Sequence, residues 1–363
     1  MINLKDHLKV ALPLYLYPFR IGGIGNFGIG VSVFNLLLPL IIFLYVGSFR
    51  RIGFKPLPFI VYFIAISIFR NANLLSAVNL TFSYIFIIYY FDFIKNFKGA
   101  LRHFFISSFA ICIISLLLYL VDIPFGGVFS AATADAEAFL HIPRMNGIFL
   151  EPSHAGMILA LLFSTLLFIY KKKDIHKYIS LTTFILTQSA FGFLLFILVN
   201  FRKYFLILGI LVAFYLLLNT DLELFIQSSG GVRLYGLFYM ISNFSLVDII
   251  VGHGSGYGIK FFSETIGSDF GLEIFNGFIA ELILDVGLLG ICIAIIYIPK
   301  IGDKIFFLIF LILLLFNFGF TVSLFPYLLA FISVYKLTVS KNINDRRKQR
   351  MIKTLELKKV NVN

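Results

Sequence analysis

Long apolar runs with almost no charge recur along this chain and constrain its fold more than any other feature. A helix needs about 20 apolar residues to cross a membrane core of about 30 Å. Only 13% of the residues are charged, whereas a soluble domain has about 25%. The chain is therefore predicted to be an integral membrane protein. The strongest runs are 29–49, 74–91, 104–121, 153–170, 204–220 and 276–298; weaker ones are 8–25, interrupted by Pro and Arg20, and the short 56–69.

Basic residues gather in short clusters between these runs, and the clusters predict the orientation of the chain. Cytoplasmic loops of membrane proteins carry an excess of Lys and Arg. Placing the clusters in the cytoplasm leaves Arg70 and the stretches 122–152 and 221–275 on the outer side. The net charge of +12 is explained by these loops, so no nucleic-acid partner is expected. The clusters are Arg50–Arg51, Lys95–Arg102, Lys171–Lys173, Arg202–Lys203 and Lys300–Lys304.

Residues 178–200 lie between two cytoplasmic clusters and must therefore cross the membrane an even number of times. As one helix they would extend only about 34 Å, which is enough for a single crossing. They are predicted to form a broken or re-entrant pair of helices that turns near Gln188–Gly192. Irregular backbone is tolerated at that depth where protein or a water-filled cavity surrounds it. A similar turn is predicted at Asn317–Phe320, within residues 305–336.

These patterns together predict an all-α, polytopic integral membrane protein with about 10–12 transmembrane helices. Residues 1–335 are expected to form a single transmembrane domain. Its large outer loop spans residues 221–275, where six carboxylates accompany two cations. Residues 336–363 are expected to form a basic cytoplasmic tail.

Three arginines fall on the predicted outer side, away from the cytoplasmic clusters: Arg70, Arg144 and Arg233. Arginine binds phosphate through two parallel hydrogen bonds and stays charged at any working pH. Three of them on one face favour an anionic ligand there. The alternative is that each one anchors the chain at the membrane interface or pairs with a nearby carboxylate.

Glu151-Pro152-Ser153-His154 opens the run at 153–170. Proline suits the first position of a helix, and the start of this helix would face outward, where its dipole favours negative charge. A partly desolvated Glu151 could act as a general base. The alternative is that Glu151 only caps the helix, and His154 is expected to be a packed histidine.

The segment Gly252-His253-Gly254-Ser255-Gly256-Tyr257-Gly258 is rich in glycine. Glycine lets the backbone approach a ligand closely, so Gly252, Gly254 and Gly256 are candidate ligand contacts. A flexible loop is the alternative. No strand and helix surround this segment, which excludes a dinucleotide fingerprint. No metal site or other cofactor is predicted, because Asp135, Glu137 and His141 fit no ligand spacing.

Several segments in order resemble the bacterial O-antigen polymerase and O-antigen ligase superfamily. Residues 144–152 (RMNGIFLEP) resemble the Arg-x-x-Gly-x-Phe-x-Glu-Pro signature of polysaccharide polymerases. Residues 186–192 resemble the Ser-Arg-Gly turn of that superfamily, and Arg233 followed by GHGSGYG resembles its large outer loop. Residues 275–290, with Asp285-x-Gly287-Leu288-Leu289-Gly290, resemble its His-Asn…Glu-x-Gly-Leu-Leu-Gly segment.

The resemblance implies a metal-independent glycosyltransferase of the bacterial inner membrane, active at the periplasmic face. It would polymerise undecaprenyl-pyrophosphate-linked oligosaccharide repeats into O-antigen or capsular polysaccharide, with membrane lipid around it and a chain-length regulator as a candidate partner. Arg144, Arg233 and Arg70 would bind the pyrophosphate, with Arg233 also serving catalysis. Glu151 or His253 would deprotonate the acceptor hydroxyl.

Three other functions compete with polymerisation. An O-antigen ligase would use the same donor, but Phe275 and Ala190 replace the His and Arg of the superfamily motifs, which argues against a ligase. A flippase or other transporter should show charges in mid-membrane, and few are present here. A structural scaffold would leave the outer arginines replaceable.

Overall fold

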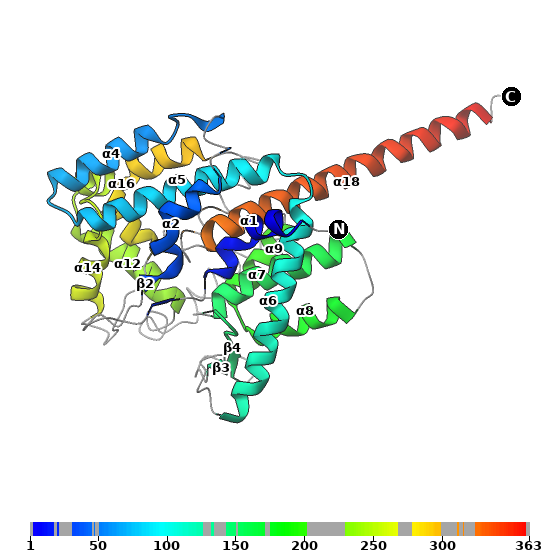
Figure 1. The fold of residues 1–363 in the computed structure, drawn as a ribbon, viewed down its shortest axis with the longest axis horizontal. Helices are drawn as coiled ribbons and strands as arrows, with labels where there is room; N and C mark the ends of the chain where they lie inside the picture. The colour runs from blue at the N-terminus through cyan, green and yellow to red at the C-terminus, as the bar shows by residue number, and fades with distance from the viewer. Residues whose placement is uncertain are drawn as a thin grey trace.

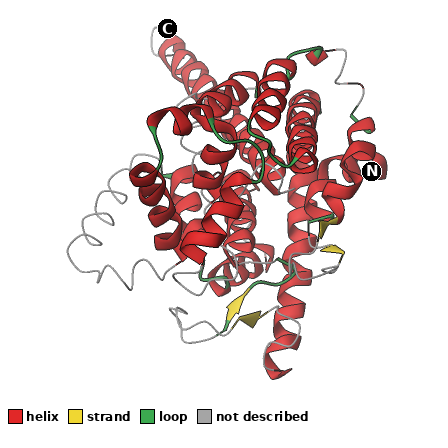
Figure 2. Cartoon of the chain, turned by 90° about the vertical axis from the view of Figure 1, so that its left-hand side faces the viewer, coloured by secondary structure: helices red, strands yellow, loops and turns green. Residues whose placement is uncertain are grey.

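The computed structural model describes residues 3–17, 20–21, 31–45, 47, 51–125, 132–133, 143–149, 152–170, 175–201, 229–267, 278–298, 311, 315 and 324–360. Helices make up most of the described chain (Figure 2). They are α1 (Leu4–Tyr15), α2 (Val33–Phe43), α4 (Leu57–Phe69), α5 (Leu74–Asn96), α6 (Ala100–Asp122), α7 (Pro152–Thr165), α8 (Ile175–Leu186), α9 (Ala190–Asn200), α12 (Ser229–Asn243), α13 (Leu246–Val251), α14 (Tyr257–Phe262), α16 (Phe278–Tyr297) and α18 (Leu324–Val360).

Two short antiparallel strand pairs accompany the helices. β1 (Arg20–Ile21) pairs with β2 (Val31–Ser32), and β3 (Ala132–Thr133) pairs with β4 (Arg144–Met145). Each strand has two residues, so the pairs close local turns and build no sheet core. The predicted all-helical architecture is confirmed at this level.

Four described helices are long and apolar enough to cross a membrane: Leu74–Asn96, Ala100–Asp122, Pro152–Tyr170 and Ile279–Tyr297. They coincide with the runs predicted at 74–91, 104–121, 153–170 and 276–298. The runs predicted at 29–49 and 56–69 form shorter apolar helices, α2 and α4. Residues 204–220 and the turn at Asn317–Phe320 lie outside the described residues, and the total of about 10–12 crossings stays a prediction.

The predicted break near Gln188–Gly192 is present as an interruption between α8 and α9. α8 ends at Leu186, and α9 begins at Ala190. Gln188 has a φ of +47°, and the Ser189 hydroxyl accepts a 3.0 Å hydrogen bond from the Gly192 amide. A left-handed residue followed by a serine N-cap ends one helix and starts the next.

α9 packs backbone against backbone on α7. A Cβ on Gly192 would lie 2.7 Å from the carbonyl carbon of Gly156, and a Cβ on Gly156 would lie 2.3 Å from the Cβ of Ser189. Small residues allow this separation between apolar helices. The Ser189–Gly192 segment therefore has a packing role in this fold.

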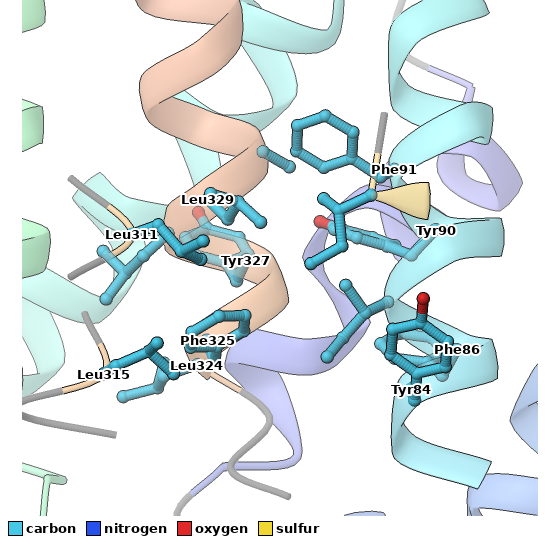
Figure 3. Packing of buried hydrophobic residues seen from close by; sticks show 14 of the residues in the cluster. Tyr84, Phe86, Tyr90, Phe91, Leu311, Leu315, Leu324, Phe325, Tyr327 and Leu329 are labelled. Carbon is cyan, nitrogen blue, oxygen red and sulfur yellow. The ribbon is translucent and has the colours of Figure 1, made fainter. Parts of the chain in front are cut away.

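Aromatic side chains fill the core between α5 and α18 (Figure 3). Their hydroxyls find partners inside it: Tyr327 shares hydrogen bonds with Ser107 (2.8 Å) and Ser108 (2.9 Å), and Tyr90 donates to the Val10 carbonyl at 2.7 Å. A buried hydroxyl without a partner would cost about 1–3 kcal/mol.

One tyrosine repairs a defect in α1. Pro13 lies inside this helix and has no N–H to bond the carbonyl four residues earlier, which belongs to Lys9. The Tyr45 hydroxyl donates to that carbonyl at 2.6 Å. The hydrogen bond that proline removes is thus replaced by one from a buried side chain.

α18 runs through the predicted boundary between residues 335 and 336 without interruption. Its first turns, from Leu324 to Ile332, are buried in the core. Its C-terminal part projects away from the body of the protein (Figure 1). The basic tail is therefore a continuation of a core helix, as far as Val360.

Candidate functional site

A cavity of about 860 Å³ opens between the α4–α5 turn and the segment from His253 to Glu264. We call it the glycine-loop cavity. It brings together residues that are far apart in the sequence, among them the predicted site residues Arg70, His253 and Gly256. The lining residues are Arg70, Asn71, Ala72, Asn73, Ser76, His253, Ser255, Gly256, Tyr257, Ile259, Lys260, Ser263 and Glu264.

Arg70 stands in a tight turn between α4 and α5. Its amide closes the last turn of α4 on Ile66, and Asn71 takes a left-handed φ of +50°, which asparagine tolerates better than most residues. Asn73 then caps α5, because its side-chain oxygen accepts hydrogen bonds from the amides of Leu75 (3.0 Å) and Ser76 (3.2 Å). The turn thus fixes the backbone from which the Arg70 side chain extends.

Asp248 connects Arg70 to His253. Its carboxylate lies 3.1 Å from Arg70 Nη2 and 3.4 Å from His253 Nε2, and it accepts a 2.6 Å hydrogen bond from the Ser245 hydroxyl. The hydrogen bond from Ser245 lowers the pKa of Asp248 most, and His253 and Arg70 lower it further. Asp248 is therefore ionised at neutral pH and orients both partners.

His253 lies between aromatic rings at the edge of the cavity. Its ring stacks on Tyr257 at a centroid distance of 4.3 Å and meets the edge of Phe244 at 5.5 Å. Burial lowers its pKa from the ordinary 6.5, and Arg70 lowers it further, whereas Asp248 acts in the opposite direction. The imidazole is thus neutral at pH 7 and able to accept a proton.

The glycine segment is held against α16. The amides of Gly256 and Gly258 donate to the Asp285 carboxylate at 3.0 and 2.7 Å. A Cβ on Gly252 would lie 2.6 Å from the Gly287 amide nitrogen, and one on Gly254 would lie 2.6 Å from the Ala72 Cβ. Of the three glycines predicted as ligand contacts, Gly252 and Gly254 therefore approach protein, whereas Gly256 lines the cavity.

The structure does not gather all the predicted site residues at this cavity. Arg144 lies in β4, which packs against α6, α7 and α8, away from α14 (Figure 1). Arg233 lies on α12, but its side chain, like the whole of Glu151, is outside the described residues. His154 is buried and shares a hydrogen bond with the Tyr17 hydroxyl, as expected for a packed histidine.

Sequence reasoning missed the roles of Asp248 and Lys260 and the contacts that Asp285 makes with the glycine segment. Asp248 and Lys260 appeared only as charges in a long outer loop. Their positions in the sequence could have indicated a site: Asp248 lies in the apolar stretch before the glycine segment, and Lys260 follows the segment. Asp285 did appear in the resembling segment, but the amides that its carboxylate binds, Gly256 and Gly258, are 29 and 27 positions away in the sequence.

Within the described part of the chain, no three His, Cys, Asp or Glu side chains gather closely enough to hold a metal ion. Comparisons of the chain with protein-family models, with curated proteins and with solved structures find no match. The chemistry of the glycine-loop cavity is therefore the main guide to function.

Proposed function

We propose that this protein is a membrane glycosyltransferase of the bacterial inner membrane. It polymerises undecaprenyl-pyrophosphate-linked oligosaccharide repeats at the periplasmic face, into O-antigen or capsular polysaccharide. The observation that carries the proposal is a cavity lined by a cation, Arg70, and a neutral histidine, His253, which the ionised carboxylate of Asp248 joins.

The side chains that line the cavity suit both the pyrophosphate and the sugars of the proposed reaction. Arg70 and Lys260 offer positive charge for the pyrophosphate, which would share them with Asp248 and Glu264. The α5 helix starts at the same place, and its dipole adds partial positive charge. The side chains of Asn71, Ser76 and Ser263 offer the amide and hydroxyl groups with which a sugar forms hydrogen bonds.

The chemical step follows from these positions. His253 takes the proton from an acceptor sugar hydroxyl, and the resulting oxygen attacks the anomeric carbon of the donor. A new C–O bond forms as the bond between that carbon and the pyrophosphate oxygen breaks. Undecaprenyl pyrophosphate leaves with the bonding electrons, and Arg70 stabilises its growing charge.

Large exposed apolar side chains near the cavity support a lipid-linked donor. Phe69 and Leu75, on either side of the Arg70 turn, are 87% and 80% exposed, and Leu246 at the start of α13 is 71% exposed. In a bilayer such side chains lie among acyl chains. A polyprenyl tail can then remain in the membrane while its pyrophosphate reaches Arg70.

A gel of surface polysaccharide tests the proposal. A deletion strain is complemented with wild type, Arg70→Ala or Arg51→Ala. Arg51 is a matched control. It precedes the N-terminus of α4, whereas Arg70 follows the C-terminus, and it forms a similar ion pair with Asp92 at 2.9 Å. We expect the deletion to leave core bearing one repeat, wild type and Arg51→Ala to restore the ladder, and Arg70→Ala to fail at normal protein level.

Other outcomes would separate the competing functions. Bare core with polymer built up on its lipid carrier would favour a ligase. Bare core with single repeats trapped inside the cell would favour a flippase. An unchanged ladder in the deletion strain, with unchanged capsule, would refute polymerisation of either polysaccharide.

A further inference from the structure

Asp285 accepts three hydrogen bonds from backbone amides of the glycine segment. Its two carboxylate oxygens accept from the amides of Gly256 and Gly258, and its backbone carbonyl accepts from Gly254 at 2.9 Å. The neighbouring Leu284 carbonyl accepts from the His253 amide at 2.6 Å. Four hydrogen bonds thus join one turn of α16 to the loop between α13 and α14 and to the first turn of α14.

The backbone of α16 is shaped for this contact. Gly287 interrupts the helix with a φ of +72°, and a Cβ there would lie 2.3 Å from the Ile250 carbonyl oxygen. On the loop side, a Cβ on Gly258 would lie 2.6 Å from the Glu281 carbonyl oxygen. Only glycine allows both approaches, because any side chain would push the loop and the helix apart.

Amides that a glycine-rich loop could offer to a phosphate are therefore occupied by the protein itself. Gly256 and Gly258 donate to the Asp285 carboxylate, and His253 and Gly254 donate to backbone carbonyls of α16. The side chains that this segment presents to the cavity are instead those of His253, Ser255 and Tyr257. A carboxylate that accepts several backbone amides fixes the loop conformation, since each bond defines a direction as well as a distance.

We propose that Asp285 is a positioning residue, which holds the glycine loop on α16 so that His253 and Tyr257 stand at the cavity. The role of Asp285 in catalysis rests on the proposed function, whereas its role in holding the loop on α16 does not. Asp285 contacts no substrate in this scheme and acts through His253.

The structural part is tested by a disulfide that needs no substrate. The hydroxyls of Ser76 and Ser255 are 2.7 Å apart, so Ser76→Cys and Ser255→Cys place two thiols within reach of a disulfide. The background carries Cys112→Ser and Cys292→Ser, and an added oxidant closes the bond. We expect the double-cysteine protein to crosslink rapidly when Asp285 is kept, and equally rapidly with the control substitution Asp92→Asn. With Asp285→Asn the crosslinking rate should be about tenfold lower, because the loop then samples other conformations.

A second pair of variants covers the case in which Asp285→Asn does not fold. Asp285→Glu keeps the carboxylate and should restore part of the crosslinking rate. Gly258→Ala disturbs the same contact from the loop side and should lower that rate as Asp285→Asn does. Unchanged crosslinking in Asp285→Asn, or in Gly258→Ala, would overturn the proposal.

The catalytic part is tested by the pH dependence of polymerisation. His253 is faced by Asp248 of α13, Arg70 after α4, Tyr257 of α14 and, through the loop, Asp285 of α16. Releasing the loop exposes His253 to water, and its pKa returns toward 6.5. In Asp285→Asn we expect kcat to fall about 100-fold and the acid limb of the profile to move to higher pH. An equal loss of rate at every pH would contradict positioning of His253, whereas failure of wild type to polymerise would refute the proposed function and leave the crosslinking result standing.

Discussion

Glycine and histidine occur both at the α7–α9 contact and at the glycine-loop cavity, but they have different roles in the two regions. In the α7–α9 contact, a Cβ on Gly192 would lie 2.7 Å from the backbone of Gly156. At the cavity, a Cβ on Gly256 would find its nearest neighbour, the Ser76 hydroxyl, at 3.7 Å. Gly192 allows a close approach between two backbones, whereas Gly256 is favoured by its left-handed φ of +79°. The neighbouring helices determine whether a glycine faces another backbone or the cavity.

The two histidines of these regions show the same contrast. His154 is 4% exposed, and its imidazole shares a hydrogen bond with the Tyr17 hydroxyl. His253 lines a cavity, with an ionised carboxylate 3.4 Å from its Nε2. The role of a histidine near a helix end is thus ambiguous in sequence, and its neighbours in space resolve the ambiguity.

The largest expected difference between the regions is in catalysis. His253→Gln should lower the rate of polymerisation about 1000-fold, because the general base is lost. His154→Gln should instead lower thermal stability and retain most of the activity per folded molecule. Initial rates with purified lipid-linked repeats, normalised to monodisperse protein, measure both. A similar loss of rate in the two variants would erase the distinction.

The α7–α9 contact should dominate stability. Gly192→Ala places a Cβ against the backbone of Gly156 and should destabilise the protein by about 3 kcal/mol. Gly47→Ala is the control, since a Cβ there meets nothing within 4 Å. Thermal unfolding in detergent compares them, and equal unfolding temperatures would show that the helices can separate at little cost.

The guanidinium of Arg70 should matter to the reaction more than its charge alone. Arg70→Ala should lower the rate about 100-fold. Arg70→Lys should recover only part of it, because an ammonium cannot bind Asp248 and a phosphate through a planar fork. Full activity of the lysine variant would instead indicate an interfacial anchor.

The smallest expected effect is that of Asp248 on the pH dependence of the reaction rate. The Asp248 carboxylate favours the protonated form of His253, so it opposes the lowering of the His253 pKa. Asp248→Asn removes that influence and should move the acid limb of the rate profile to lower pH. A pH titration of the initial rate measures it, and a shift to higher pH would contradict the arrangement.

Much of the helical framework could be predicted because hydropathy and charge are local properties. Two basic clusters and the length of a helix predict a break near Gln188–Gly192, and the structure has it at Thr187–Ser189. The positions of the four long apolar helices followed from runs of residues without charge. Helix lengths were less predictable: α2 is shorter than the run 29–49, and α18 passes through the expected end of the membrane domain.

The site was predictable only in part, because it is assembled from distant segments. Arg70 and His253 could be named from their types and their predicted side of the membrane. Their common partner Asp248 could not, since 178 positions separate it from Arg70. The predicted roles of Arg144, Arg233 and Glu151 stay predictions.

The bond between Tyr45 and the Lys9 carbonyl makes two positions depend on each other. Tyr45→Phe leaves that part-buried carbonyl without its donor and should cost about 1 kcal/mol. The same change should cost less in a Pro13→Ala background, where the new amide serves the carbonyl within the helix. The proline is thus tolerated on condition that the tyrosine is kept, and a lineage can lose the tyrosine safely only after it has lost the proline.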